Sequence, residues 1–227
     1  FGFTFNSDCI LETLDSKHTF FLRLTLVTSF PILLAVAVAG GWSVIRLVKQ
    51  VDYWKSKALH SFMVAIYLAY TQVAFTTFSV FSCQEVERNY WVSSDLSIQC
   101  WTQEHRLHSF AIALPSIIIW VVATPAALCA LLLNRNYSLA KPEVRVVLGF
   151  LTCHYKSTEM YWEAFVYCRK LALIILVVFL DQYPTIKAFG AFLVLSSALL
   201  FQHKSKPYLK ARLNSLEELG LISGVLT

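Results

Sequence analysis

Three long runs of residues without a charged side chain constrain this sequence more than any other feature. They cover residues 24–45, 58–84 and 107–134. A helix rises about 1.5 Å per residue, so each run is long enough to cross the roughly 30 Å hydrocarbon core of a bilayer. Apolar residues make up 57% of the chain and charged residues only 15%, whereas soluble domains carry about 25% charged residues. The sequence therefore predicts an integral membrane protein in contact with the lipid bilayer.

The pattern of apolar segments predicts an all-α, polytopic transmembrane helix bundle with about six spans. Spans are expected near residues 20–45, 59–81, 108–133, 161–180 and 184–201, and a sixth, incomplete span begins near Ser215. Residues 1–227 are expected to form one transmembrane domain, a piece of a longer polypeptide. Its connections are an outer segment over 1–19, an outer loop over 84–106 and a cytosolic connection over 134–160.

The distribution of basic residues orients the bundle. Of the 19 Lys and Arg residues, 14 lie in or beside the connections after spans one, three and five, and 5 lie on the opposite side. Cytoplasmic loops carry this excess of basic residues, so the N-terminal end is expected outside the cell. The basic residues cluster at the ends of apolar runs and form no stripe on a soluble face, which argues against nucleic-acid binding. This orientation leaves the sequon at Asn136 in the cytosol, unglycosylated.

Cysteines on the expected outer side favour a disulfide bond. Cys83 and Cys100 bracket a polar loop of 16 residues in an oxidising compartment, so we expect them to pair, which leaves Cys9 without an assigned partner. The alternative is a zinc site formed by the same two cysteines with His105 and His108, although the spacing matches no zinc-finger pattern.

A small and polar stripe runs along the second expected span. Gln72, Thr76 and Ser79 follow Ala65 and Ala69 at steps of three and four residues, so all five share one helical face. Small residues let helices approach closely, and Gln or Thr can hydrogen-bond across the contact. The stripe indicates helix packing or, alternatively, a pore-lining face.

Proline residues occur inside two expected spans, at position 31 and at positions 115 and 125. Each proline removes a helical hydrogen bond, and in a membrane the freed carbonyl needs another partner. We expect kinks that shape the bundle.

The fourth expected span contains ionisable residues, Glu163, Arg169 and Lys170. Such groups are costly inside a bilayer and are usually paired. Glu217 or Glu218, at the base of the sixth span, could pair with Arg169 or Lys170. The alternative interpretation is that the basic side chains snorkel to the inner membrane surface.

No motif indicates an enzyme. The chain lacks G-x-S-x-G, H-E-x-x-H and a glycine-rich phosphate loop. No catalytic residue, cofactor or metal is therefore predicted.

Several short segments, in this order along the chain, resemble a known membrane module. They are residues 81–83, 95–100, 148–151, 161–163 with 169–171, 206–208 and 214–217. Together they are similar to the C-terminal multispan module of large cell-surface proteins of algae, oomycetes, ciliates and related protists, which have EGF-like, cysteine-rich or β-helix ectodomains. The module is distantly similar to transient-receptor-potential-like membrane regions. The resemblance implies a Cys83–Cys100 disulfide and further spans before Phe1.

These observations predict that the domain anchors a large cell-surface protein and holds an extracellular assembly, which could be fibrous or ciliary. The partners expected are other membrane helices and extracellular structural proteins, at the plasma membrane. The alternative is a cation channel or channel-like subunit, with Gln72, Thr76 and Arg169 near the ion pathway. A membrane enzyme or lipid transporter is a third, weaker hypothesis.

Overall fold

The computed structural model describes residues 16–49, 54–133, 154–156, 159 and 161–226. Predictions for Cys9, for the Asn136 sequon, for most of the outer segment over 1–19 and for most of the connection over 134–160 lie outside the described residues.

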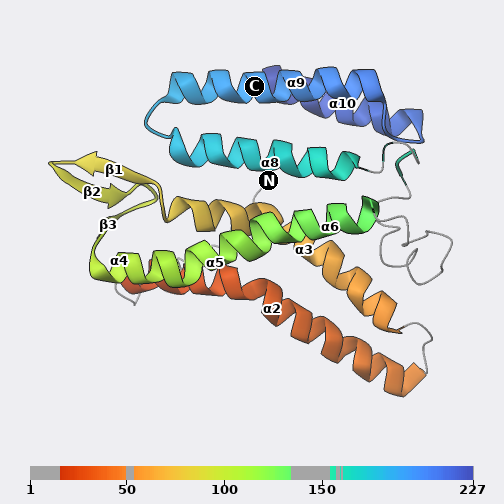
Figure 1. The fold of residues 1–227 in the computed structure, drawn as a ribbon, viewed down its shortest axis with the longest axis horizontal. Coiled ribbons are helices and arrows are strands. Elements are labelled where there is room, and N and C mark those ends of the chain that lie inside the picture. Colours follow the sequence, from red (N-terminus) through yellow and green to blue (C-terminus); the bar gives the residue numbers. More distant parts are fainter. Residues whose placement is uncertain (1–15, 50–53, 134–153, 157–158, 160, 227) are drawn as a thin grey trace.

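Helices dominate the described chain, as predicted, and a small sheet interrupts them (Figure 1). The elements are α2 (Ser16–Lys49), α3 (Trp54–Ser79), strands β1 to β3, a long helix over residues 103–133, α8 (Trp162–Phe179), α9 (Pro184–Ser205) and α10 (Ala211–Leu226). The all-α prediction is thus confirmed for the bundle, while the outer loop adds β-structure that the sequence did not predict.

Four helical segments are long and apolar enough to cross a membrane. They are Thr19–Leu47, Trp54–Ser79, Gln103–Ala130 and Pro184–Ser205. At most 22% of each apolar window is buried inside the protein, so most of these side chains face outward, as expected for a lipid environment. The predicted fourth and sixth spans correspond to α8 and α10, which are shorter and carry more charged residues. Within the part of the chain that the structure describes, length and composition therefore mark four candidate spans, and the six predicted spans are not confirmed.

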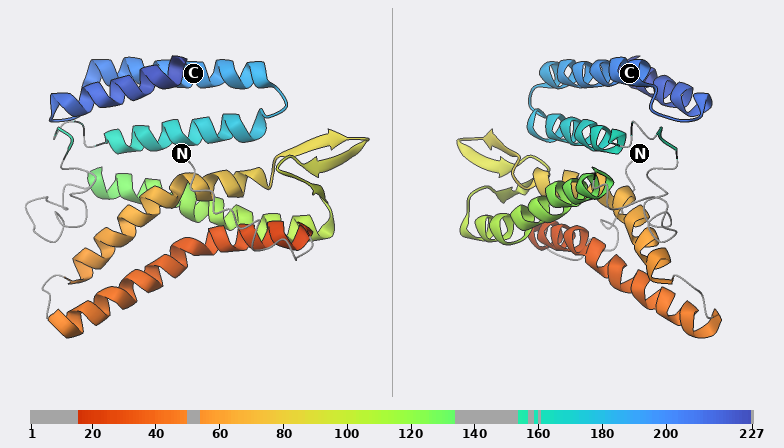
Figure 2. Two further views of the ribbon diagram at one scale, coloured as in Figure 1. Left: turned by 180° about the vertical axis from the view of Figure 1, so that it is seen from behind. Right: turned by 45° about the vertical axis from the view of Figure 1, so that its right-hand side comes forward.

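The connections alternate between two ends of the bundle (Figures 1 and 2). One end carries the three-stranded sheet and the short turn from α8 to α9. The opposite end carries the last turn of α2, the first turn of α3 and the turn from α9 to α10. The α9–α10 hairpin packs on α8, which packs on α3 and α6. The second half of α2 and the first half of α3 stay close to each other and diverge together from the other helices (Figure 2).

The main hydrophobic core lies between α3, the long helix and α8. Its buried members are Tyr70, Ala74, Val121, Leu128, Tyr167, Ile174 and Val178. Two tyrosines are the largest of these residues, and their rings meet edge to face with centroids 4.7 Å apart. Such pairs add a specific geometry to the packing.

The long helix consists of α4 (Gln103–His108), α5 (Leu114–Ser116) and α6 (Thr124–Leu133), joined by two π-helical stretches. The stretches, Ser109–Ala113 and Ile117–Ala123, each end two residues before a proline, Pro115 and Pro125. A wider π-helical turn accommodates a residue that lacks the N–H group and whose ring crowds the preceding turn. At Pro115 and Pro125 the expected kinks therefore appear as locally widened helix, whereas Pro31 lies inside the uninterrupted α-helix α2.

The sheet is an antiparallel meander of β1 (Cys83–Val86), β2 (Asn89–Val92) and β3 (Asp95–Gln99). A two-residue turn joins β1 to β2, and its residues Glu87 and Arg88 have φ values of 50° and 68°. Hairpins of this kind normally place Gly or Asn at such positions. Because neither is present, the sequence carried no hairpin signal.

Candidate functional site

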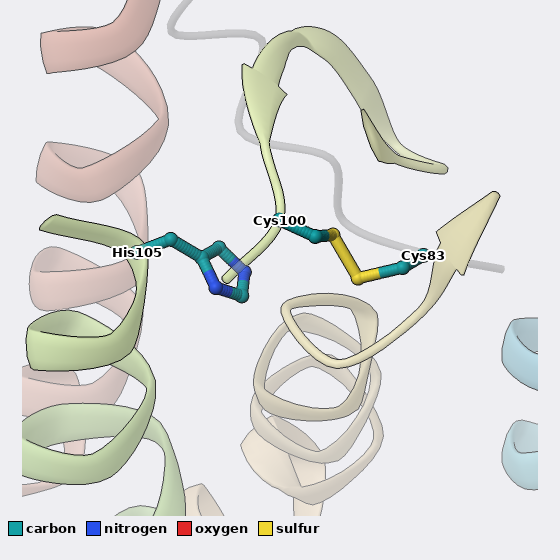
Figure 3. Close-up of side chains that lie close together, drawn as sticks. All are labelled: Cys83, Cys100 and His105. Carbon is teal, nitrogen blue, oxygen red and sulfur yellow. A yellow bond between two sulfur atoms is a disulfide. The ribbon is translucent and has the colours of Figure 1, made fainter. Parts of the chain in front are cut away.

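A disulfide bond joins Cys83 and Cys100 at the end of the bundle that carries the sheet, as Figure 3 shows. Cys83 begins β1 and Cys100 directly follows β3, and their Cα atoms lie 6.4 Å apart. This distance is ordinary for a disulfide. The bond confirms the predicted pairing and joins the two ends of the meander. We call residues 81–101 the cap.

His105 ties the cap to the helices. The side chain is fully buried, and its Nε2 atom lies 3.0 Å from the carbonyl oxygen of Val80 at the end of α3. The backbone N–H of Trp101 donates to Nδ1 at 3.3 Å. Because Nδ1 accepts a hydrogen bond, Nε2 carries the proton and the ring is neutral. Sequence reasoning considered His105 only as a metal ligand, and no motif pointed to this linking role.

The alternative zinc site is not assembled. Ligand atoms of Cys83, Cys100 and His105 lie within 4.8 Å of one another, but the two sulfur atoms are bonded to each other. Zinc binds cysteine as the thiolate, which a disulfide does not provide. His108 is engaged elsewhere, because its ring stacks on Phe21 with centroids 3.9 Å apart.

A second tie connects the cap to α8. The hydroxyl group of Ser82 donates to the carbonyl oxygen of Val178 at 2.7 Å. Val178 lies in the last turn of α8, where carbonyl groups lack helical partners. The cap is thereby joined to α3, to α4 and to α8.

The polar stripe of α3 forms hydrogen bonds inside its own helix. The side-chain amide of Gln72 donates to the Thr76 hydroxyl at 3.4 Å, and the Ser79 hydroxyl donates to the Thr76 carbonyl at 2.9 Å. Thr76 and Ser79 are buried and Gln72 is half-buried. These hydrogen bonds stay within α3, whereas the packing interpretation of the stripe expected Gln or Thr to bond across a helix contact.

Glu163, in the first turn of α8, is a buried carboxyl group at the other end of the bundle. Its side chain is only 4% exposed, and Oε2 accepts a 2.9 Å hydrogen bond from the Tyr155 hydroxyl. Burial, reinforced by the nearby Glu163 charge, raises the pKa of Tyr155 above its ordinary value, so this hydroxyl stays protonated. Oε1 has no hydrogen-bond partner among the residues that the structure describes.

Lys170 does not form an ion pair with Glu163 on the same helix. Its Nζ atom lies 4.1 Å from the ring centroid of Tyr67 and 5.8 Å from that of Tyr167. A cation over an aromatic face is attracted by the ring quadrupole. The ammonium group therefore finds aromatic partners between α3 and α8, and not the acidic partner that the sequence suggested for Lys170.

Arg169 and Glu217 join α8 to α10. The guanidinium nitrogen lies 2.6 Å from the carboxylate oxygen, and both side chains are mostly shielded from solvent. This is one of the two partners that the sequence proposed for Arg169. The other, Glu218, lies 3.4 Å from Nδ1 of His203 on α9.

The turn between α9 and α10 is held against the segment before α8, and we call residues 154–156 and 206–209 the latch. The N–H of Lys156 donates to the Pro207 carbonyl, and the N–H of Leu209 donates to the His154 carbonyl, both at 2.9 Å. The rings of Tyr155 and Tyr208 stack with centroids 4.9 Å apart. Sequence reasoning missed the latch, because it depends on pairing between segments about 50 residues apart.

Asn214 supports the latch from the first turn of α10. Its side-chain oxygen accepts from the Tyr208 N–H at 3.2 Å, and its side-chain nitrogen donates to the Tyr208 carbonyl at 3.0 Å. Gln202 on α9 donates to the same side-chain oxygen at 3.3 Å. One buried amide thus fixes the geometry of the α9–α10 turn.

Comparisons with protein-family models, with curated proteins and with solved structures find no match for this chain. The cap, the buried charges of α8 and the latch therefore carry the functional argument.

Proposed function

We propose that this chain is the membrane-anchoring domain of a large cell-surface protein and holds an extracellular assembly at the plasma membrane. The cap faces outward and the latch faces the cytosol, in agreement with the distribution of Lys and Arg. The kind of assembly is inferred from the resemblance to protist surface proteins, and a fibrous or ciliary assembly is the form that this resemblance suggests.

The observation that carries the proposal is the way the cap is fastened to the helices. A disulfide closes the sheet, His105 bonds to the end of α3, and Ser82 bonds to the end of α8. A force applied to the outer side would pass into several helices at once. An anchor needs this coupling, whereas a flexible loop would not provide it.

We infer that α8 and α10 also lie within the bilayer, which gives the six spans expected from the sequence. Their charged groups have partners inside the protein: Arg169 binds Glu217, Lys170 lies over two tyrosine rings, and Tyr155 donates to Glu163. Paired ionisable groups that face the bundle interior are tolerated in membranes. The latch then closes the cytosolic end.

A display experiment tests the anchor. An epitope-tagged soluble domain is fused before Phe1 and expressed in cells. We expect antibody to reach the tag on intact cells and the fusion to stay in the membrane fraction after an alkaline carbonate wash. A tag that is reached only after permeabilisation, or a fusion released by carbonate, would refute the proposal. A variant with Cys83→Ser and Cys100→Ser serves as the comparison.

A cation channel is the second candidate, because Glu163 and Lys170 are ionisable groups set between helices. The expected signature is a single-channel conductance in planar bilayers that Glu163→Gln alters in size or in cation preference. Glu159→Gln, a neighbouring change in the segment before α8, is the control. An anchor shows no conductance with any of the three proteins.

A further inference from the structure

A cavity of about 360 Å³ lies at the outer end of the bundle, beside the cap. Its floor is formed by Phe21 of α2 and Ile98 of β3, both buried in a small hydrophobic cluster. Trp91 of β2 forms a half-buried aromatic wall. The cavity thus combines a permanent apolar floor with a large ring whose surface a ligand can reach.

The rim of the cavity is polar and carries a single formal charge. Gln99, Gln103 and Glu104 lie there with exposed side chains. Among the lining residues that the structure describes, none is Lys or Arg. His105 also lines the cavity, but its ring is neutral, because Nδ1 accepts from the Trp101 N–H and Nε2 bonds to the Val80 carbonyl. The electrostatic character of the cavity is therefore negative.

The Glu104 carboxylate is available to a ligand. No ion pair involving Glu104 occurs within the described ranges of the chain. Its backbone carbonyl, not its carboxylate, accepts from His108. The helix that carries it is fixed in place, since Thr102 caps α4 by accepting from the His105 N–H. Glu104 therefore lines the cavity from a rigid element, and Trp91 lines the same cavity from β2.

We propose that this cavity binds a small organic ammonium ion from the outer aqueous phase. An ammonium group placed between Glu104 and Trp91 gains an opposite charge on one side and an aromatic face on the other. Its alkyl groups pack on Phe21 and Ile98. The side-chain amides of Gln99 and Gln103 donate hydrogen bonds to a ligand hydroxyl or accept them from it. A phospholipid head group with a choline or ethanolamine end would bring a phosphate, for which the described lining offers no cation.

Choline and its uncharged isostere 3,3-dimethylbutan-1-ol separate charge recognition from simple filling of an apolar cavity. Saturation-transfer NMR on protein in phosphatidylglycerol nanodiscs measures binding of each probe. We expect choline to bind and the alcohol to bind roughly tenfold more weakly, since the cationic contribution at a partly desolvated aromatic site is of that size. Equal binding of the two probes overturns the proposal, as does an absence of choline binding.

Two matched pairs of variants locate the site. Glu104→Gln and Trp91→Leu are each expected to weaken choline binding roughly fivefold or more, because each removes one of the two cation contacts. Glu85→Gln removes an exposed acid outside the cavity, and Tyr90→Leu removes the neighbouring aromatic side chain on the opposite face of β2. These two controls are expected to bind choline normally. Equal losses in a cavity variant and its control overturn the assignment.

A lipid arm of the experiment distinguishes the source of the ammonium group. The titration is repeated in phosphatidylcholine nanodiscs. We expect unchanged choline affinity, because the cavity takes the free ion. If phosphatidylcholine abolishes choline binding while phosphatidylglycerol permits it, the occupant is a lipid head group and the proposal of a free ligand is wrong.

Discussion

The hydroxyl group of Tyr70 on α3 donates a 3.4 Å hydrogen bond to the backbone carbonyl of Val121, four residues before Pro125. A proline removes the helical partner of the carbonyl four residues earlier. In the π-helical stretch before Pro125, however, the Thr124 N–H bonds to the Ile119 carbonyl, five residues earlier, so the regular bonding pattern is already altered there. The hydrogen bond from Tyr70 joins this irregular stretch to α3, and neighbouring helices can satisfy such carbonyls in a membrane.

Replacement of Tyr70 by Phe removes this donor and keeps the ring in the core. We expect a loss of about 1 kcal/mol in the free energy of unfolding, since hydrogen bonds between membrane helices contribute about that much. The measurement is an SDS titration of the purified protein in mixed micelles. Tyr183→Phe, at an exposed position between α8 and α9, is the control and should have no effect. Equal effects of the two changes would contradict this role for Tyr70.

Loss of the disulfide should destabilise the cap. Cys83 and Cys100 are 17 residues apart in sequence, and closure of a loop of this size contributes about 3 kcal/mol by loop entropy. We expect dithiothreitol and the double change Cys83→Ser with Cys100→Ser to lower the unfolding temperature equally. Dithiothreitol should not shift the double variant further. A wild-type protein insensitive to the reductant would contradict a stabilising disulfide.

Substitution of His105 by Leu should loosen the cap even with the disulfide intact. It leaves the Val80 carbonyl buried without its partner, at a cost of about 1–3 kcal/mol, and it removes the acceptor of the part-buried Trp101 N–H. Hydrogen exchange should become faster at Trp101. His203→Leu changes an exposed histidine and should leave exchange in the cap as in the wild type. Unchanged protection in His105→Leu would rule out the linking role.

Double-mutant cycles should separate a shielded ion pair of the helix bundle from a more exposed one. Arg169 and Glu217 are mostly shielded, so replacement of both by Gln should reveal a coupling of about 1–2 kcal/mol. Lys187 and Asp181 lie 2.7 Å apart but more exposed, and exposed pairs typically contribute less than about 1 kcal/mol. Coupling energies are read from SDS titrations. Equal coupling in both pairs would show that α8 and α10 are not joined as described.

The latch should weaken at alkaline pH. Burial raises the pKa of Tyr155 and of Tyr208 in the folded protein above the value of about 10 in an unfolded chain. Above pH 10 the unfolded chain therefore binds fewer protons, and stability falls as pH rises. Tyr155→Phe should unfold more easily at neutral pH, because Glu163 loses its donor, yet show a shallower alkaline decline. An equal alkaline slope in the variant would contradict this assignment.

Features encoded by local pattern could be predicted from the sequence. Long uncharged runs identified the helices, because crossing a bilayer requires about 20 apolar residues. The placement of Cys83 and Cys100 on the expected outer side predicted the disulfide bond between them. Arg169 could be given an acidic partner because a charge inside a membrane needs one.

Features that depend on three-dimensional context could not be predicted. The β1–β2 turn uses Glu87 and Arg88, which carry no turn signal, so the sheet was missed. Lys170 lies over Tyr67, on a helix about a hundred residues earlier, and no local pattern indicates that contact. The latch and the linking role of His105 likewise require segments that meet only after the helices pack.

Labelling of engineered cysteines in intact cells tests the central claim, that the cap lies outside and the latch lies in the cytosol. Glu85→Cys in the cap and Lys204→Cys beside the latch are made separately in a chain whose other free cysteines, Cys9, Cys129, Cys153 and Cys168, are replaced by Ser. A membrane-impermeant maleimide is predicted to label Glu85→Cys on intact cells and Lys204→Cys only after permeabilisation. The reverse pattern, or labelling of both positions from outside, would contradict the proposed orientation and with it the anchor.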